Sequence, residues 1–142
     1  MTSADENRTL AYALARVGLG VNIALHGLVR LPKLDSFAKG LQEQFASSIL
    51  PSFLVQVSAY GIVFAEAVLG VLILLGWFLR PALVLGALLM IFLITGTCLI
   101  ENWSAAGIQM TYLGFYAVLL ATANYDGFSV DQLRHGGRQR RR

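Results

Sequence analysis

The chain of 142 residues is long enough for one domain and too short for a second hydrophobic core. Apolar residues make up 56% of it and charged residues only 13%, with a net charge of +3, whereas a soluble domain is typically about 25% charged. In water such a composition would expose large hydrophobic patches. It therefore argues against an ordinary soluble domain and predicts an integral membrane protein.

Four apolar segments are each long enough to cross a bilayer, which takes about 20 residues as a helix. They are residues 10–31, 51–79, 82–100 and 105–123. Four spans cannot close a β-barrel, so we expect an all-α, polytopic bundle of four transmembrane helices in a single domain. The N-terminal residues 1–8 are polar and no small-residue cleavage site ends the first segment, so we expect that segment to stay as a span.

The connection at residues 32–50 has the pattern of a helix with two faces. Apolar side chains recur at helical spacing and charged ones lie on another face, which predicts a short amphipathic helix in the membrane interface. The alternative is an ordinary solvated helix. The apolar residues are Leu34, Phe37, Ala38, Leu41 and Phe45, and the charged residues are Asp35, Lys39 and Glu43.

The later connections are short. Arg80 and Pro81 are expected to form a hairpin turn, with proline starting the third span. Trp103 lies between spans three and four, at the depth where aromatic belts occur. After the fourth span, Ser129 is placed to cap a short helix over residues 130–133, and residues 134–142 form a basic tail.

The basic residues predict the orientation. Arg8, Arg80 and the five arginines of the tail share one side of a four-span chain, and Arg30, Lys33 and Lys39 lie on the other. Because the basic excess stays inside, we expect both termini in the cytoplasm. We expect the tail to set topology or attract anionic lipid, and we expect no nucleic-acid binding.

Small residues recur at helical spacing within two spans. They are Gly61 with Ala65, and Gly114 with Ala117 and Ala121. Such patterns allow close helix packing, although glycine and alanine are also simply common in membrane helices. Both interpretations stay open at this stage.

Ionisable side chains inside a span are costly and mark function by default. Three lie well inside the first two spans, away from their ends, namely Arg16, His26 and Glu66. Since neighbouring spans run antiparallel, we expect Arg16 to reach Glu66 and form a buried ion pair. That pair would be either a structural contact or part of substrate or proton handling.

Further polar residues of the first two spans are expected to lie in line with these three and to be candidate ligand contacts. Asn22 lies one turn from His26 on the same helix face, and Arg30 follows near the end of the span. Gln56 and Tyr60, one turn apart on the second span, are expected to face His26. The alternative for His26 is a helix-end histidine bonded to a loop carbonyl.

Several chemistries have no support in the sequence. It has no Cys/His cluster, so no metal site is predicted, and it has no phosphate-binding loop or dinucleotide fingerprint. A bis-histidine haem is not expected because His135 lies in the polar tail, and Cys98 is expected to be a buried apolar residue. A quinone or a partner protein would have to supply any redox chemistry.

Several short motifs follow one another along residues 10–133. They are an early arginine, a His-Gly pair with basic residues beyond it, a Leu-Pro start to span two, a mid-span glutamate with a glycine four residues later, an LG-x-x-x-R-x-A turn and a Ser-x-Asp segment. In order and spacing they resemble the motifs of the DoxX/DoxD family of small bacterial four-helix membrane proteins. Where the family often has lysine after His-Gly, this chain has arginine first. The residues are Arg16, His26, Gly27, Arg30, Lys33, Leu50, Pro51, Glu66, Gly70, Arg80, Ser129 and Asp131.

One branch of this family forms the membrane subunit of a thiosulfate:quinone oxidoreductase, and other members accompany redox or detoxification proteins. The resemblance therefore implies a membrane subunit of a redox-associated assembly in the bacterial cytoplasmic (inner) membrane, binding a quinone or a small hydrophobic ligand. The alternative is a non-catalytic structural or assembly subunit. Expected partners are membrane lipid and other subunits or further copies of the chain; whether it is an enzyme stays open.

Overall fold

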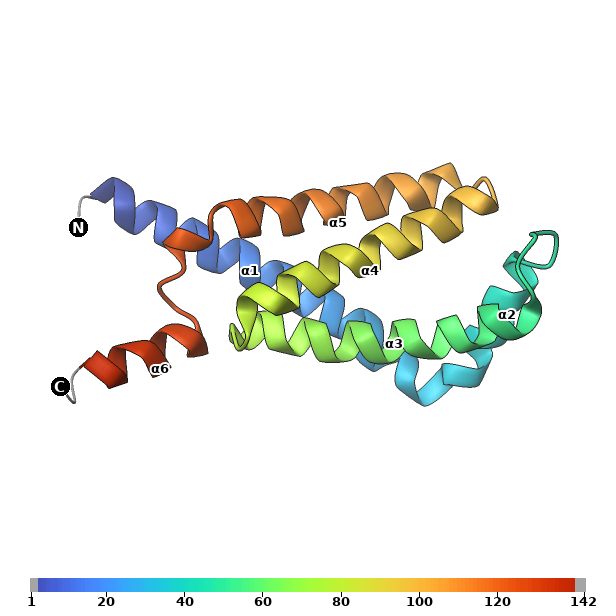
Figure 1. The fold of residues 1–142 in the computed structure, drawn as a ribbon, viewed down its shortest axis with the longest axis horizontal. Coiled ribbons are helices and arrows are strands. Elements are labelled where there is room, and N and C mark those ends of the chain that lie inside the picture. Colours follow the sequence, from blue (N-terminus) through green and yellow to red (C-terminus); the bar gives the residue numbers. More distant parts are fainter. Residues whose placement is uncertain (1–2, 140–142) are drawn as a thin grey trace.

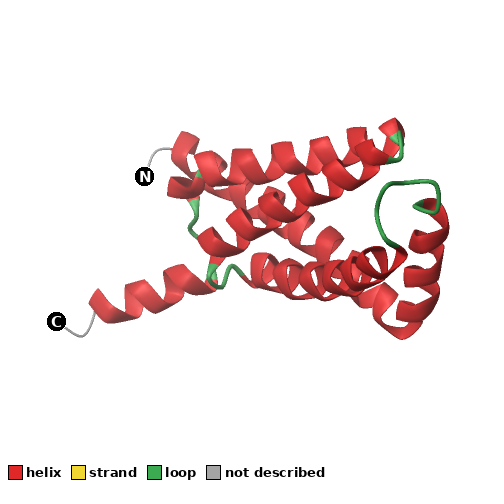
Figure 2. Cartoon of the chain, turned by 45° about the vertical axis from the view of Figure 1, so that its right-hand side comes forward, coloured by secondary structure: helices red, strands yellow, loops and turns green. Residues whose placement is uncertain are grey.

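The computed structural model describes the backbone of residues 3–139 and the side chains of residues 3–134. Every regular element in that range is helical, as expected of an all-α protein (Figures 1 and 2). Part of the basic tail, and the side chain of His135, lie outside the described residues. The elements in chain order are α1 (Ser3–Arg30), η1 (Leu31–Lys33), α2 (Leu34–Gln44), α3 (Ser52–Leu75), α4 (Leu79–Leu99), α5 (Trp103–Ala121), η2 (Ala123–Tyr125) and α6 (Val130–Gln139).

Four helices in the described chain, α1, α3, α4 and α5, are long and apolar enough to cross a membrane, which confirms the predicted four-span bundle. The polar residues from Ser3 onward extend α1 instead of preceding it. At one end of the bundle, the α6 end, lie the N-terminus, the α3–α4 turn and α6; at the opposite α2 end lie α2 and the α4–α5 turn (Figure 1).

The most intimate helix contact is between α1 and α3. At three points a glycine on one helix lies so close to the other that a Cβ atom would overlap its backbone: Gly20 at Leu74, Gly27 at Ala67, and Gly70 at Ala24. In each pair the residue numbers sum to 94, which defines the antiparallel register of the two helices. Small residues thus allow the backbones to touch, as in many membrane helix pairs.

These are not the small residues that the sequence pattern pointed to. Gly61 and Gly114 lie on exposed helix faces, and no atom outside their immediate helix neighbourhood lies within 4 Å of a Cβ built on either. Within the described chain, these two glycines therefore mediate no close approach. Gly86 does, since Tyr116 of α5 packs directly over it.

The turn between α3 and α4 differs from the expected Arg80-Pro81 hairpin. Helix α3 ends earlier, at Leu75, because Gly76 adopts a left-handed conformation with φ of 67°. Trp77 N–H donates to Leu72 O at 3.0 Å, the signature of a glycine-ended helix. Arg80 and Pro81 consequently lie in the first turn of α4, where proline costs no hydrogen bond.

The segment after η1 forms helix α2, and α3 begins after Pro51. Ala38 of α2 is buried. Phe45, the residue after the end of α2, packs against Gly96 of α4. Helix α2 therefore covers the α2 end of the bundle from one side (Figure 2). Its placement in a membrane interface stays a prediction.

The C-terminal helix is anchored as predicted but is longer. Ser129 Oγ accepts a hydrogen bond from Gln132 N–H at 3.2 Å, which makes Ser129 the expected N-terminal cap. Helix α6 then continues to Gln139, beyond the predicted residues 130–133.

Candidate functional site

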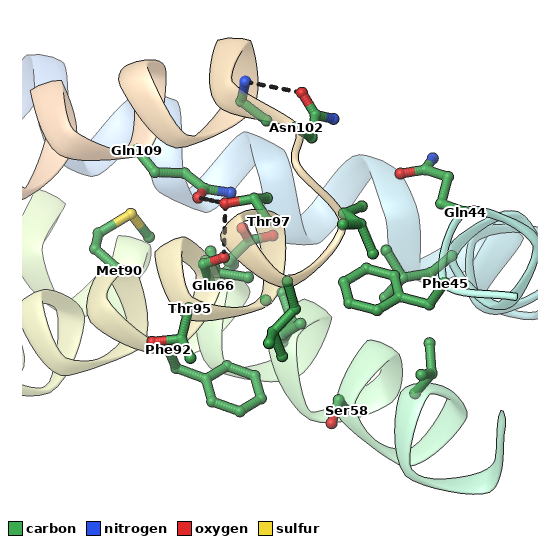
Figure 3. Close-up of a pocket in the computed structure, with 18 of the residues that line it drawn as sticks. Gln44, Phe45, Ser58, Glu66, Met90, Phe92, Thr95, Thr97, Asn102 and Gln109 are labelled. Atoms are coloured by element: carbon green, nitrogen blue, oxygen red, sulfur yellow. Dashed lines mark hydrogen bonds between the residues drawn. The ribbon is translucent and has the colours of Figure 1, made fainter. Parts of the chain in front are cut away.

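A cavity of about 780 Å³ lies inside the α2 end of the bundle. It separates the tightly packed α1–α3 pair from the α4–α5 hairpin, and α2 closes it from the side (Figure 3). Its volume is in the range of cavities that hold small organic ligands. Most of the wall is apolar, including Ile23, Phe37, Leu54, Ile62 and Met90.

An ion pair forms the charged part of the wall. Arg30, the last residue of α1, places Nη1 2.6 Å from Glu66 Oε2 in the middle of α3. Glu66 is only 3% exposed, whereas about a third of the Arg30 side chain is accessible. The guanidinium also lies 4.8 Å from the ring centroid of Phe37 in α2, a cation–π distance. Three helices thus meet at one charged group.

His26 lies one turn before Arg30 and also lines the cavity. Its Nδ1 is 2.9 Å from the carbonyl oxygen of Asn22, in its own helix and not in a loop as one interpretation had it. Its ring meets the ring of Tyr112 edge to face, with centroids 6.3 Å apart. The Asn22 side-chain amide donates to the Tyr112 hydroxyl at 3.0 Å, which ties α1 to α5 beside the cavity.

The opposite wall carries uncharged polar groups. Thr97 of α4 donates to the side-chain oxygen of Gln109 in α5 at 2.8 Å, and both side chains border the cavity (Figure 3). The cavity therefore has charged groups from α1 and α3 in its wall and uncharged polar groups from α4 and α5.

The cavity is not sealed from the outer surface of the bundle. Leu54 of α3 and Phe92, Thr95 and Leu99 of α4 line it and are also exposed on the bundle surface. Because α3 and α4 are membrane spans, these residues form a side opening toward the lipid.

The predicted ion pair between Arg16 and Glu66 is wrong. In the glycine-defined register, position 28 of α1 lies opposite Glu66, and Arg16 lies about 12 residues further along α1, or about 18 Å by helix rise. Arg30, two residues beyond position 28, is within reach and takes the partner role.

Arg16 instead lies at the α6 end, where it is 3% exposed. Its Nη1 donates to the carbonyls of Ile73 and Leu74 at 2.8 and 2.7 Å, and its Nη2 donates to Phe128 O at 3.2 Å. The two α3 carbonyls belong to the last turn of that helix, where a cation interacts favourably with the helix dipole. Arg16 therefore caps α3 and holds the C-terminal segment.

Asp131 caps the start of the neighbouring helix, α4. Its carboxylate accepts hydrogen bonds from the backbone N–H groups of Phe78 and Leu79 at 3.1 and 2.8 Å. Phe78 has a φ of 48°, a strained conformation for a non-glycine residue, and this contact supports it. A cation and a carboxylate thus clamp the α3–α4 turn.

Gln56 and Tyr60 do not face His26 either. The Tyr60 hydroxyl donates to Asp35 of α2 at 3.0 Å, and the Gln56 amide donates to the Tyr60 hydroxyl at 3.3 Å. Neither residue lines the cavity, so they tether α2 to α3.

Of the seven residues named from the sequence, the structure brings His26, Arg30 and Glu66 to the cavity and places Asn22 beside it. Sequence reasoning missed Gln109 and Tyr112. The signal was available, because both are polar side chains inside a mostly apolar fourth span.

Comparison with curated proteins and with solved structures found no significant match. A family model does match. It is the DoxX model, and it covers residues 11–102, from the start of the first span to the connection before the fourth. The matched part contains His26, Arg30 and Glu66 and spans more than half of the chain. The chain therefore belongs to the DoxX family.

Proposed function

We propose that this protein is the membrane subunit of a redox-associated assembly and that its cavity binds a quinone or a chemically similar lipophilic ligand. The redox centre would belong to a partner protein, since the described side chains of this chain offer a binding site and not an electron carrier. The supporting observation is the cavity, in which one charged cluster of His26, Arg30 and Glu66 lies among apolar walls.

The cavity suits an aromatic head group with oxygen substituents. One N–H group of Arg30 donates to Glu66, so the other N–H groups of the guanidinium can donate to a ligand oxygen. His26 and Gln109 offer additional polar contacts on facing helices. The surrounding Ile23, Ile62 and Met90 match the faces of a ring, as is typical of sites that orient a ligand with few polar groups.

The side opening supports a ligand that reaches the site from the bilayer. An aliphatic tail would pass between α3 and α4, next to Leu54 and Phe92, while the head stays in the cavity. Following the basic residues, the protein would lie in a bacterial cytoplasmic membrane with both termini inside. In that orientation the cavity lies in the outer half of the membrane.

The test is a binding measurement on the purified protein in mild detergent. Organic extracts are first analysed for co-purified quinone, and decylubiquinone is then titrated by calorimetry. Ser58→Trp would fill the cavity from α3, because Ser58 lines it. Val57→Trp places the same side chain on the same helix but on the exposed face, where Val57 is 51% accessible.

We expect Ser58→Trp to weaken decylubiquinone binding by at least tenfold and Val57→Trp to leave it unchanged. Equal effects of the two variants, or no binding by the native protein, would contradict a ligand-binding role. In the latter case, recovery of the chain only together with partner chains would favour the alternative of a structural or assembly subunit.

A further inference from the structure

The hydrogen bonding of His26 determines what its ring offers to the cavity. Nδ1 lies 2.9 Å from the Asn22 carbonyl oxygen. A carbonyl oxygen can only accept, so the proton of the neutral imidazole is on Nδ1. Nε2 is then an acceptor, and among the described residues none donates a hydrogen bond to it. In the neutral imidazole, the carbonyl of the His26 helix thus favours one tautomer and leaves an acceptor nitrogen for a ligand.

The neighbours of His26 leave that acceptor available. On α3, Glu66 is an acceptor too and is engaged with Arg30 of α1. On α5, Tyr112 meets the imidazole through its ring, and its hydroxyl bonds the Asn22 amide. The residues of α2 and α4 that line the cavity, among them Phe37, Leu41, Met90 and Leu93, carry no charge.

We infer that the ligand carries a hydroxyl group that donates to His26 Nε2, so that the cavity favours the hydroquinone form of a quinone over the oxidised form. This inference rests on the proposed function. A hydroxyl can donate to Nε2 while its oxygen accepts from the free N–H groups of Arg30. The carbonyl oxygens of an oxidised quinone only accept, so they leave Nε2 of the half-buried His26 facing another acceptor. An acceptor that a ligand covers without offering it a donor weakens binding by about tenfold or more.

The test compares three ligands that share the same substituted ring and decyl tail under anaerobic conditions: decylubiquinol, decylubiquinone and the dimethyl ether of decylubiquinol. Only the first can donate a hydrogen bond. We expect decylubiquinol to bind about tenfold more tightly than the other two. His26→Phe should remove this difference while the protein still binds decylubiquinone. His26→Gln, whose amide oxygen can accept, should keep part of it.

Equal affinities for the three ligands would overturn the inference and leave the proposed function standing. A preference for decylubiquinol that survives His26→Phe would equally overturn it, because another residue would then be the acceptor. Absence of binding by any of the three would refute the proposed function itself. If His26→Phe does not fold, the dimethyl ether and His26→Gln decide the question on their own.

Discussion

Replacing Arg30 with methionine removes the positive partner of a carboxylate that is only 3% exposed. Breaking a buried ion pair from one side typically costs about 3–5 kcal/mol, because the remaining charge has no compensation. Glu66 can avoid carrying an uncompensated charge by taking up a proton, which for an ordinary carboxyl group costs about 4 kcal/mol at neutral pH. We therefore expect Arg30→Met to lower the free energy of unfolding by about 3–4 kcal/mol.

The opposite change should cost less. In Glu66→Gln the stranded group is Arg30, which ends α1 and has about a third of its side chain accessible. A long arginine near a helix end can turn its head toward water, so we expect a loss of about 1 kcal/mol. The double variant leaves a neutral amide beside methionine and should lose about 2 kcal/mol, mostly from the missing hydrogen bond. The resulting coupling is about 2–3 kcal/mol.

The free energies of unfolding of the native protein, the two single variants and the double variant are measured in mixed detergent micelles by circular dichroism. The matched control is the cycle of Arg16→Met with Glu66→Gln, since these residues lie about 18 Å apart along the helix pair and should not couple. Additive effects in the Arg30 cycle, or coupling above about 1 kcal/mol in the Arg16 cycle, would refute this description of the charged cluster.

Three further predictions follow from the fold. Gly27→Ala should destabilise the protein by about 2 kcal/mol or more, because its methyl group would overlap the backbone of α3, whereas Gly61→Ala should be neutral or slightly stabilising in the same unfolding assay. Asp131→Ala should cost about 1–2 kcal/mol through loss of the α4 cap, and should expose the α3–α4 turn to faster proteolysis. In a background without the native cysteine, an impermeant thiol reagent applied to cells should label a cysteine at position 40 and not one at position 137; the reverse pattern would invert the proposed topology.

The number and nature of the spans could be predicted from the sequence because bilayer thickness alone determines how long an apolar helix must be. His26, Arg30 and Glu66 could be found for a similar reason, since an ionisable side chain inside a span is costly and is retained where it pairs with another group or has a function. The C-terminal end of α3 could also have been predicted from the sequence. Gly76 follows a long apolar run, and glycine at that place commonly ends a helix.

The pairing of the charges could not be predicted, because it depends on how far one helix slides along another. That register is determined by contacts such as Gly27 on Ala67, and a sequence does not show which small residues face each other. The role of Arg16 depends on an even more distant feature. One of its acceptors, Phe128, lies 112 residues away in a segment after the last span.

The two polar clusters of this bundle differ in their surroundings, and that difference separates structure from binding. At the α6 end, Arg16 and Asp131 hydrogen-bond the backbone groups of helix ends. The buried Nε of Arg16 has no hydrogen-bond partner among the described residues, but neither Arg16 nor Asp131 borders the cavity. At the α2 end, Arg30 and Glu66 compensate each other, yet His26 Nε2 and part of the guanidinium lack hydrogen bonds from the described residues and border a cavity of about 780 Å³. A cluster built only for stability would be better packed without that space, because the residues around an empty cavity lose packing contacts. A ligand that fills the cavity and bonds these polar atoms would restore the contacts, and for this reason the α2 end is the place to look for the function of the protein.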